Sequence, residues 1–537
     1  MKAQQLGWIF LIFCFTLLII GFPNCSYAEN VPFFPIQSIR RNMEGIGKSV
    51  FYGTRIENFS VEVLDVVIGK DINQSYIVVK VTDEKIKKMG GISAGMSGSP
   101  IFFSGKLAGA LAYSWETKDN LIGVVTPIEA MLKLWENIPE SSTVLQVAPS
   151  SVIFTIGLSE RAGKRLEEKT SFFSRKIVSL PATLYSQRSN IQSVEIQPGS
   201  AIGVQLIHGD VDVVSLGTVT WRDDNKILAF GHPFLHQGKV NYFLSSMYVN
   251  FSLEGKDFPF KVGTPIQPIG IVDEDRSAGI AGRLGVIPKA IKADIEIGNE
   301  TGILSQNNFE IIQDENVVVE FFPEIILNSI DQALDSQRPG SVKVNLSIDG
   351  NEFYFQDEFF WVSKIDISSY TSNNLGKILE DIFKNPFQPI KAEKISIKII
   401  FIPDIREATF RNLFLPVDVK RGNDLKGRID LNLYRQDIRS LDFGLFVPRD
   451  FVPGEAEVVV RGMSWSDENI QSSSPQADLD NYINEKVKQL KSNGLIIEMR
   501  SKSETYSSDT QKNFFSEVVS LPFVLEGSFT GSVVVLE

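Results

Sequence analysis

Short apolar segments separated by glycine-rich or polar turns run from about Pro32 to Pro139, and they restrict the fold of this chain more than any other feature. The segments are Lys48–Tyr52, Val61–Ile68, Tyr76–Val81, Ile101–Phe103 and Leu107–Ala112. Short strands that follow one another with turn signals between them predict a β-barrel or a β-sandwich. The next stretch, Thr126–Glu136, has a proline near its start and apolar residues at helical spacing, so it predicts a helix that closes this unit.

A second β unit is predicted from about residue 198 to residue 288, and most of the chain after it is also β-rich. Further segments expected to be strands are Val317–Pro323, Val342–Ile348, Glu352–Val362 and Lys394–Phe401, with a helix at Leu375–Phe383. The expected division is a leader at 1–28, a first β unit at 32–139, a connecting segment at 140–198, a second β unit at 199–290, a β-rich domain with a helix at 291–402, an Ig-like β-sandwich at 403–465 and a C-terminal helix with strands at 466–537. The predicted fold class is therefore mainly β.

The first 28 residues have the features of an export signal. One lysine precedes the apolar run Leu6–Gly21, and Ser26-Tyr27-Ala28 fits the small-residue pattern of a cleavage site. We expect a protein exported to the periplasm or the cell exterior, in contact with the envelope. Because the apolar run is about as long as the shortest membrane spans, an uncleaved anchor is the alternative.

Cysteine content and charge exclude several classes of function. Both cysteines, Cys14 and Cys25, lie in or beside the leader, so the mature chain is expected to have no disulfides, no thiol catalysis and no cysteine metal site. The net charge is −12 and there is no basic cluster, which argues against nucleic acid as a partner. No cofactor is predicted, and the oligomeric state is left open.

A serine lies among small residues in the segment from Gly90 to Pro100, between two apolar runs. Gly95 and Gly98 flank Ser97 closely, and glycines allow positive φ angles that bring backbone N–H groups near a serine oxygen. This pattern is typical of a nucleophile held in a tight turn. A plain glycine-rich hairpin is the alternative. The α/β-hydrolase nucleophile motif does not fit, since its final glycine is missing and the segment after the serine predicts a strand.

Three histidines are the candidate bases: His208, His232 and His236. His232 follows an apolar strand and lies between Gly231 and Pro233, which restrict its backbone, so it is the preferred general base. A histidine with a structural role is the alternative. His208 and His236 have the sequence context of surface residues. Proline after His232 argues against the helix that would join His232 and His236 in a zinc site.

A carboxylate is needed to orient the histidine ring. Asp83 follows the strand ending near Thr82 and precedes the serine segment, so it is the preferred acid. Its alternative role is as the N-cap of a short helix that begins at Glu84. The other candidates are Asp210, Asp212, Asp223 and Asp224.

Several of these motifs together resemble a known family. Val79-Lys80-Val81-Thr82-Asp83, Gly90-Gly91-Ile92, Gly95-Met96-Ser97-Gly98-Ser99-Pro100-Ile101 and Gly105-Lys106-Leu107-Ala108-Gly109-Ala110 resemble the serine-bearing half of the SpoIVB-type serine peptidases. Gly217-Thr218-Val219-Thr220, Ala229-Phe230-Gly231-His232-Pro233 and Gly279-Ile280-Ala281-Gly282-Arg283-Leu284 resemble the histidine-bearing half. The resemblance covers about residues 35–290.

The resemblance implies a chymotrypsin-like double β-barrel with the active site between the barrels. It implies that Ser97 is the nucleophile, His232 the general base and Asp83 the acid, and that backbone N–H groups of Gly95 and Ser97 form the oxyanion hole. The halves occur here in exchanged order, with the serine before the histidine. No PDZ-like domain precedes the serine half, so we do not carry over the sporulation role.

The predicted function is that of an exported serine endopeptidase acting on a protein or peptide, whose C-terminal β modules bind substrate, cell wall or an envelope partner. One alternative is a binding or scaffold protein on the same fold without turnover. Another is a self-processing protein that cuts its own connecting segment.

Overall fold

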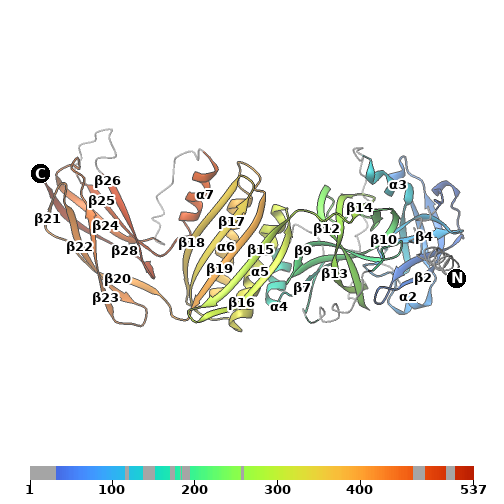
Figure 1. Ribbon diagram of the computed structural model, residues 1–537, viewed down its shortest axis with the longest axis horizontal. Coiled ribbons are helices and arrows are strands. Elements are labelled where there is room, and N and C mark those ends of the chain that lie inside the picture. The colour runs from blue at the N-terminus through green and yellow to red at the C-terminus, as the bar shows by residue number, and fades with distance from the viewer. Residues whose placement is uncertain are drawn as a thin grey trace, which may run out of the picture.

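The computed structural model describes residues 32–114, 120–136, 152–169, 176–181, 183, 194–254, 259–463, 478–502 and 514–537. Their elements follow one another along an elongated molecule, with the first strands at one end and the last strands at the other (Figure 1). The predicted leader at 1–28, with both cysteines, lies outside the described residues, and so do parts of the connecting segment. No helix within the described ranges is long and apolar enough to cross a membrane.

The first six strands form a closed barrel in the order β1-β2-β3-β6-β5-β4. They are β1 (Glu44–Val50), β2 (Ile56–Val67), β3 (Tyr76–Val81), β4 (Ser99–Phe103), β5 (Lys106–Ser114) and β6 (Ile122–Pro127). Alternate residues of a strand point to opposite faces, so β3 sends Ile77, Val79 and Val81 into the barrel core. The shorter elements around it are η1 (Ile36–Ser38), η2 (Ile72–Gln74), α2 (Glu84–Lys88), α3 (Ile128–Leu132) and η3 (Lys133–Trp135).

A second ring of six strands follows. It contains β9 (Ala201–Gly209), β10 (Asp212–Asp223), β11 (Lys226–Ala229), β12 (Gly238–Leu253), β13 (Phe260–Arg276) and β14 (Gly279–Leu284). Their pairing order is β9-β12-β13-β14-β11-β10, and the pairing of β9 with β10 closes the ring. The chymotrypsin-like double β-barrel expected from the resemblance is therefore the architecture of this part of the chain.

Unlike the first barrel, the second barrel belongs to a larger sheet. Beyond β10 lie β7 (Val152–Ile156) and β8 (Lys176–Leu180), and beyond β9 lie β16 (Gly302–Ile312), β15 (Ala290–Asn299), β19 (Ala392–Ile402), β17 (Gly340–Gly350) and β18 (Phe353–Ser363). The helices that share its hydrophobic core are α4 (Glu160–Lys169), α5 (Glu315–Leu334), α6 (Ile367–Phe383) and α7 (Leu479–Lys488). Strand pairing and the hydrophobic core thus continue past residue 290, and the predicted division at that residue stays a prediction.

Helix α5 corrects one prediction, because the segment Val317–Pro323 was expected to be a strand. Asp314 caps the helix, accepting hydrogen bonds from the backbone N–H groups of Asn316 and Val317. The apolar run is buried on nearly every side, so it shows no polar face from which a helical period could be recognised. Pro323 was expected at the end of a strand, but it lies inside the helix.

The C-terminal region consists of two sheets that share one hydrophobic core. One sheet has the order β23-β22-β20-β27 and the other β21-β28-β24-β25-β26. The strands are β20 (Glu407–Phe414), β21 (Asp418–Lys420), β22 (Asp424–Leu433), β23 (Ile438–Phe446), β24 (Gly454–Gly462), β25 (Gly494–Ser501), β26 (Phe514–Ser520), β27 (Val524–Glu526) and β28 (Ser528–Leu536). The last strands of the chain therefore complete these sheets, whereas α7 packs with the central helices through Ile483 and Val487 (Figure 1).

The two barrels meet through apolar side chains. In one cluster, Val50 and Ala94 from the first barrel pack with Leu216 and Val262 from the second. In another, Ala110 packs in a group that includes Leu228 and Ala281 of the second barrel. Burial of such surface stabilises the junction by about 25 cal/mol per Å², so the barrels have a defined relative position.

Candidate functional site

The serine loop, residues 90–98, connects α2 to β4. Gly95 and Gly98 have φ angles of 93° and 92°, in the region that favours glycine. A Cβ atom on Gly98 would lie 1.9 Å from the Thr218 carbonyl oxygen of β10. No side chain fits there, which explains the glycine after Ser97.

Hydrogen bonds from the second barrel hold this loop. The Thr218 N–H donates to the Ser97 carbonyl at 2.8 Å, and the Thr218 hydroxyl donates to the Gly95 carbonyl at 3.0 Å. The Thr220 hydroxyl donates to the Gly98 carbonyl at 2.8 Å. The serine loop of the first barrel is therefore fixed from β10 of the second.

Ser97 itself is 4% exposed, and its Oγ–H donates to the Ala112 carbonyl of β5 at 3.4 Å. That distance is long for a hydroxyl bond. Met96 N–H and Gly98 N–H donate to the carbonyls of Ser93 and Leu111. Among the backbone hydrogen bonds of the described residues, neither the Gly95 N–H nor the Ser97 N–H is a donor.

The histidine loop, residues 230–237, connects β11 to β12. Phe230 and Gly231 both have positive φ, 67° and 71°, so the chain turns sharply before His232. The ring of His232 is buried, and its centroid lies 5.5 Å from that of Tyr113 and 5.7 Å from that of Phe230. Its Nδ1 lies 2.8 Å from the Pro233 carbonyl oxygen. Because a carbonyl oxygen only accepts, this contact assigns the hydrogen to Nδ1 and leaves the lone pair on Nε2.

Both loops contact the same part of β5. Ser97 Oγ reaches the Ala112 carbonyl, and a Cβ on Gly231 would lie 2.8 Å and 3.2 Å from the Cβ atoms of Ala110 and Ala112. The hydroxyl of Thr126 on β6 also donates to the Gly231 carbonyl, at 2.6 Å. The structure thus brings the serine loop and the histidine loop to neighbouring residues of one strand at the junction of the barrels.

Asp83 lies at the start of α2. One of its carboxylate oxygens accepts hydrogen bonds from Lys85 N–H at 2.9 Å and Ile86 N–H at 3.4 Å. This is the N-cap role that the sequence offered as its alternative. The role of Asp83 as the acid of a triad stays a prediction.

A different carboxylate, Asp275 at the end of β13, shapes the histidine loop. It is fully buried and accepts hydrogen bonds from the backbone N–H groups of Phe234 at 2.6 Å, Leu235 at 2.6 Å and His236 at 2.8 Å. Burial raises the pKa of this carboxyl, and the bonds from the loop oppose that rise. Sequence reasoning missed it because Asp273, Glu274 and Asp275 are adjacent acids, and only folding decides which of them is buried.

The other two histidines lie away from these contacts. His208 is partly exposed, and its Nδ1 lies 3.4 Å from Asp212 Oδ1. His236 is exposed, and its Nε2 lies 3.3 Å from the Ser277 hydroxyl oxygen. Within the described ranges, no group of three or more His, Cys, Asp or Glu side chains is arranged to hold a metal ion.

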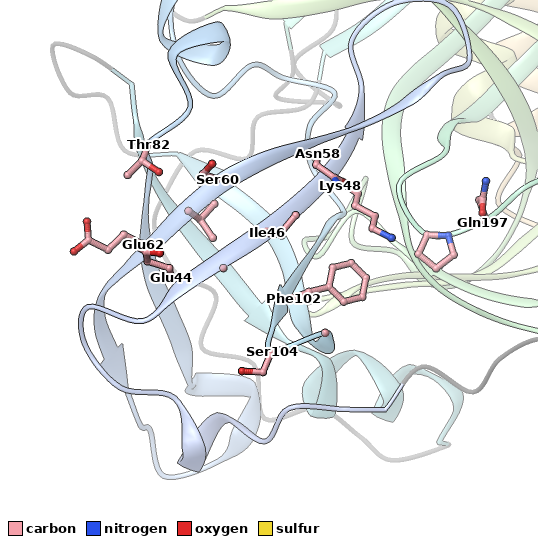
Figure 2. A pocket seen from close by; sticks show the side chains of 14 residues that line it. Glu44, Ile46, Lys48, Asn58, Ser60, Glu62, Thr82, Phe102, Ser104 and Gln197 are labelled. Atoms are coloured by element: carbon pink, nitrogen blue, oxygen red, sulfur yellow. The ribbon is translucent and has the colours of Figure 1, made fainter.

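A groove of about 950 Å³ lies on the outer face of β1, β2 and β4 (Figure 2). Glu44 and Glu62 are opposite one another on β1 and β2, and Lys48 Nζ lies 5.0 Å from the centroid of the Phe102 ring. Gln197 and Pro198 line its side toward the second barrel. Ser97 and His232 are not among the residues that line it, so this groove is separate from the meeting point of the two loops.

The two six-stranded barrels have the architecture of chymotrypsin-like double-barrel proteins, and the serine loop and the histidine loop lie at their junction. The family model described as SpoIVB peptidase S55 matches residues 27–132. The match covers the first barrel and the serine loop, so it confirms the resemblance to SpoIVB-type serine peptidases for this part of the chain. The matched segment ends before the second barrel begins. Comparisons with curated proteins and with solved structures returned no match.

Proposed function

We propose that the protein is an exported serine endopeptidase in which Ser97 is the nucleophile and His232 the general base. The observation that carries this proposal is the contact of both loops with Ala110–Tyr113 of β5, at the junction between the barrels. The serine peptidase family match over residues 27–132 supports the same reaction.

In the proposed reaction, Ser97 Oγ forms a bond to the carbonyl carbon of a peptide while its proton passes to His232 Nε2. The same proton then goes to the leaving amine as the C–N bond breaks, which leaves an acyl-enzyme. Water, deprotonated by His232, then attacks that ester, and the proton passes from His232 to Ser97 Oγ as the acyl C–O bond breaks. The Nδ1 contact with the Pro233 carbonyl supports the proposal, because it reserves Nε2 as the basic atom.

The negative charge that develops on the peptide oxygen needs hydrogen-bond donors. We propose that these are the N–H groups of Gly95 and Ser97. Neither N–H serves a backbone acceptor among the described residues, and both lie next to or at the proposed nucleophile. Asp83 is retained as the acid implied by the resemblance, while Asp275 supports the loop that carries His232.

The substrate is proposed to be a protein or peptide outside the cytoplasm, and the C-terminal β modules are proposed to bind substrate or an envelope partner. Their two-sheet core ends in strands with exposed apolar residues, among them Val518 and Val534.

Labelling by a fluorophosphonate probe tests the proposal. Wild type should become covalently labelled, and Ser97→Ala should lose labelling completely. His232→Ala should label more slowly by about 10⁴-fold or more, whereas His236→Ala, a change four residues away at an exposed histidine, should label like wild type. Absence of labelling in wild type, or normal labelling of His232→Ala, would show that the assignment is wrong.

A binding protein without turnover is the second candidate. The burial of Ser97 and His232 favours it, since neither side chain presents much surface to a substrate in this conformation. Such a protein would take up no probe, and its affinity for a partner would be unchanged in Ser97→Ala.

A further inference from the structure

A lysine is buried completely between the two barrels. Lys261 on β13 is 2% exposed, and its Nζ donates a hydrogen bond to Ser49 Oγ of β1 at 2.8 Å. Its Nζ also lies 4.9 Å from the centroid of the Phe51 ring. Its backbone N–H donates to the carbonyl of Ala94, within the serine loop. Burial of an amine costs free energy, so we expect Lys261 to have a specific role.

From Lys261 a chain of hydroxyl groups leads to the serine loop. Ser49 Oγ and Ser99 Oγ lie 3.1 Å apart, and Ser99 Oγ lies 2.6 Å from the Met96 carbonyl oxygen. Ser49 and Ser99 are both fully buried. Neither hydroxyl is accessible to a substrate, so this group does not form a second nucleophilic site.

The hydrogen bonds of this chain converge on Ser49. The Met96 carbonyl has no hydrogen to give, so Ser99 is the donor in that bond. The Ser99 hydroxyl is also the donor toward Ser49 Oγ at 3.1 Å, so its single hydrogen is shared between two acceptors, of which the Met96 carbonyl at 2.6 Å is the nearer. Ser49 Oγ accepts from Lys261 as well. Protonated Lys261 can only donate, so it occupies a lone pair of Ser49 Oγ and leaves the Ser99 hydrogen to the Met96 carbonyl.

The end of the chain is the peptide between Met96 and Ser97. In a trans peptide the C=O and the N–H point in opposite directions, so fixing the Met96 carbonyl also fixes the Ser97 N–H. Ser99 binds that carbonyl twice, through its hydroxyl and through its N–H at 2.9 Å. The Ser97 N–H is one of the two donors proposed for the oxyanion hole.

We infer that Lys261 is a positioning residue of the proposed peptidase, which acts through Ser49 and Ser99 to hold the Met96–Ser97 peptide with its N–H available to the reacting carbonyl oxygen. The inference rests on the proposed function for its consequence in catalysis. Its structural part, the control of this peptide by Lys261, can be measured separately.

The charge state of Lys261 gives that measurement. Burial, together with the nearby charge of Lys85, lowers the pKa of Lys261 to about 7. Lys85 on α2 lies 4.7 Å from the same Phe51 ring and is paired with Glu57 of β2 at 2.6 Å, while β1 and the serine loop face Lys261 with hydroxyl, carbonyl and aromatic groups. Neutral Lys261 has a lone pair that accepts from the Ser49 hydroxyl, so deprotonation makes Ser49 Oγ a better acceptor for Ser99 and draws the Ser99 hydrogen away from the Met96 carbonyl.

Nuclear magnetic resonance can observe this one peptide. The sequence contains two Met–Ser pairs, Met96-Ser97 and Met463-Ser464. Deuterated full-length protein with carbonyl-¹³C methionine and ¹⁵N serine therefore gives two linked signals, and the second is an internal control. We expect the Met96 carbonyl and Ser97 amide shifts to titrate with a midpoint near pH 7 in wild type, and not to titrate in Lys261→Met. Ser99→Ala, which removes the last hydroxyl, should abolish the titration as well.

Probe labelling provides the catalytic readout. Lys261→Met should slow labelling by about tenfold or more, up to the 10²- to 10³-fold that loss of one oxyanion donor costs. The inference is overturned if the Met96–Ser97 signals do not titrate, or titrate equally in Lys261→Met. It is also overturned if Lys261→Met labels at the wild-type rate. If wild type takes up no probe, the proposed function fails, and the two spectra still decide whether Lys261 controls the peptide.

Discussion

Both barrels have six strands, but they differ in how many strands and core residues they share with the rest of the molecule. The first closes upon itself around its own core, whereas the second shares strands and core with the central sheet and helices. The family match covers the first barrel and ends before the second.

Their loops differ in the same way. The serine loop accepts three hydrogen bonds from Thr218 and Thr220 of the other barrel. The histidine loop is held mainly within its own barrel, by Asp275, and receives one bond across the junction from Thr126. The position of the serine therefore depends on docking of the barrels more than that of the histidine does.

Gly98→Ala should have the largest effect, because it disrupts the docking of the serine loop on the second barrel. The new Cβ would lie 1.9 Å from the Thr218 carbonyl, so the loop and β10 must separate. We expect a loss of about 4 kcal/mol or more in unfolding free energy and no probe labelling. Gly105→Ala is the matched control, since Gly105 also has a positive φ, of 75°, but open space around it. It should cost only about 1 to 2 kcal/mol, measured by urea unfolding.

Lys261→Met should change how stability depends on pH. The pKa of Lys261 is about 7 in the folded protein and 10.5 for the free side chain, so between these values the unfolded chain binds more protons. Wild-type stability should accordingly rise with pH from about 7 to about 10.5, by at most about 5 kcal/mol. The unfolding free energy of Lys261→Met should not show this rise with pH. Urea midpoints of the two proteins at several pH values test this, and parallel curves would contradict it.

Asp275→Asn sharpens the contrast by disturbing the histidine loop alone. The amide has one accepting oxygen where the carboxylate has two, so at least one of the three loop N–H groups loses its partner. We expect a loss of about 2 to 3 kcal/mol and slower probe labelling. Asp273→Asn, which weakens a partly exposed pair with Arg283, is the control. Equal stability and labelling in both variants would argue against a role for Asp275 in the loop.

Thr220→Val and Thr126→Val compare the bonds that cross the junction. Each removes one hydroxyl and keeps the shape of the side chain, so each should cost about 1 kcal/mol. Thr220→Val should slow labelling more, since Gly98 adjoins Ser97. The reverse order of labelling rates would show that the histidine loop depends more on docking.

Local pattern predicted the strand Tyr76–Val81, which the structure confirms, whereas the double barrel was predicted from the family resemblance. His232 was selected from only three histidines by its glycine and proline neighbours, and its role as a base stays a prediction. The helix α5 could not be predicted, because its apolar residues are buried all round. The roles of Asp275 and Lys261 could not be predicted from the sequence either. Both side chains are buried among strands that are distant in sequence, and no neighbouring residue indicates that burial.

The continuity of the second barrel with the central sheet has a consequence for synthesis. The first barrel is complete at residue 127 and can close while the rest of the chain is still being made, because domains fold in order from the N-terminus. The second barrel, in contrast, pairs β9 with β16 and shares its core with α5, which ends at Leu334, so its full environment is complete only later in the chain. The bonds from Thr218 and Thr220 to the serine loop can form only once β10 has been made. The first barrel can therefore close before its serine loop is held from the second barrel.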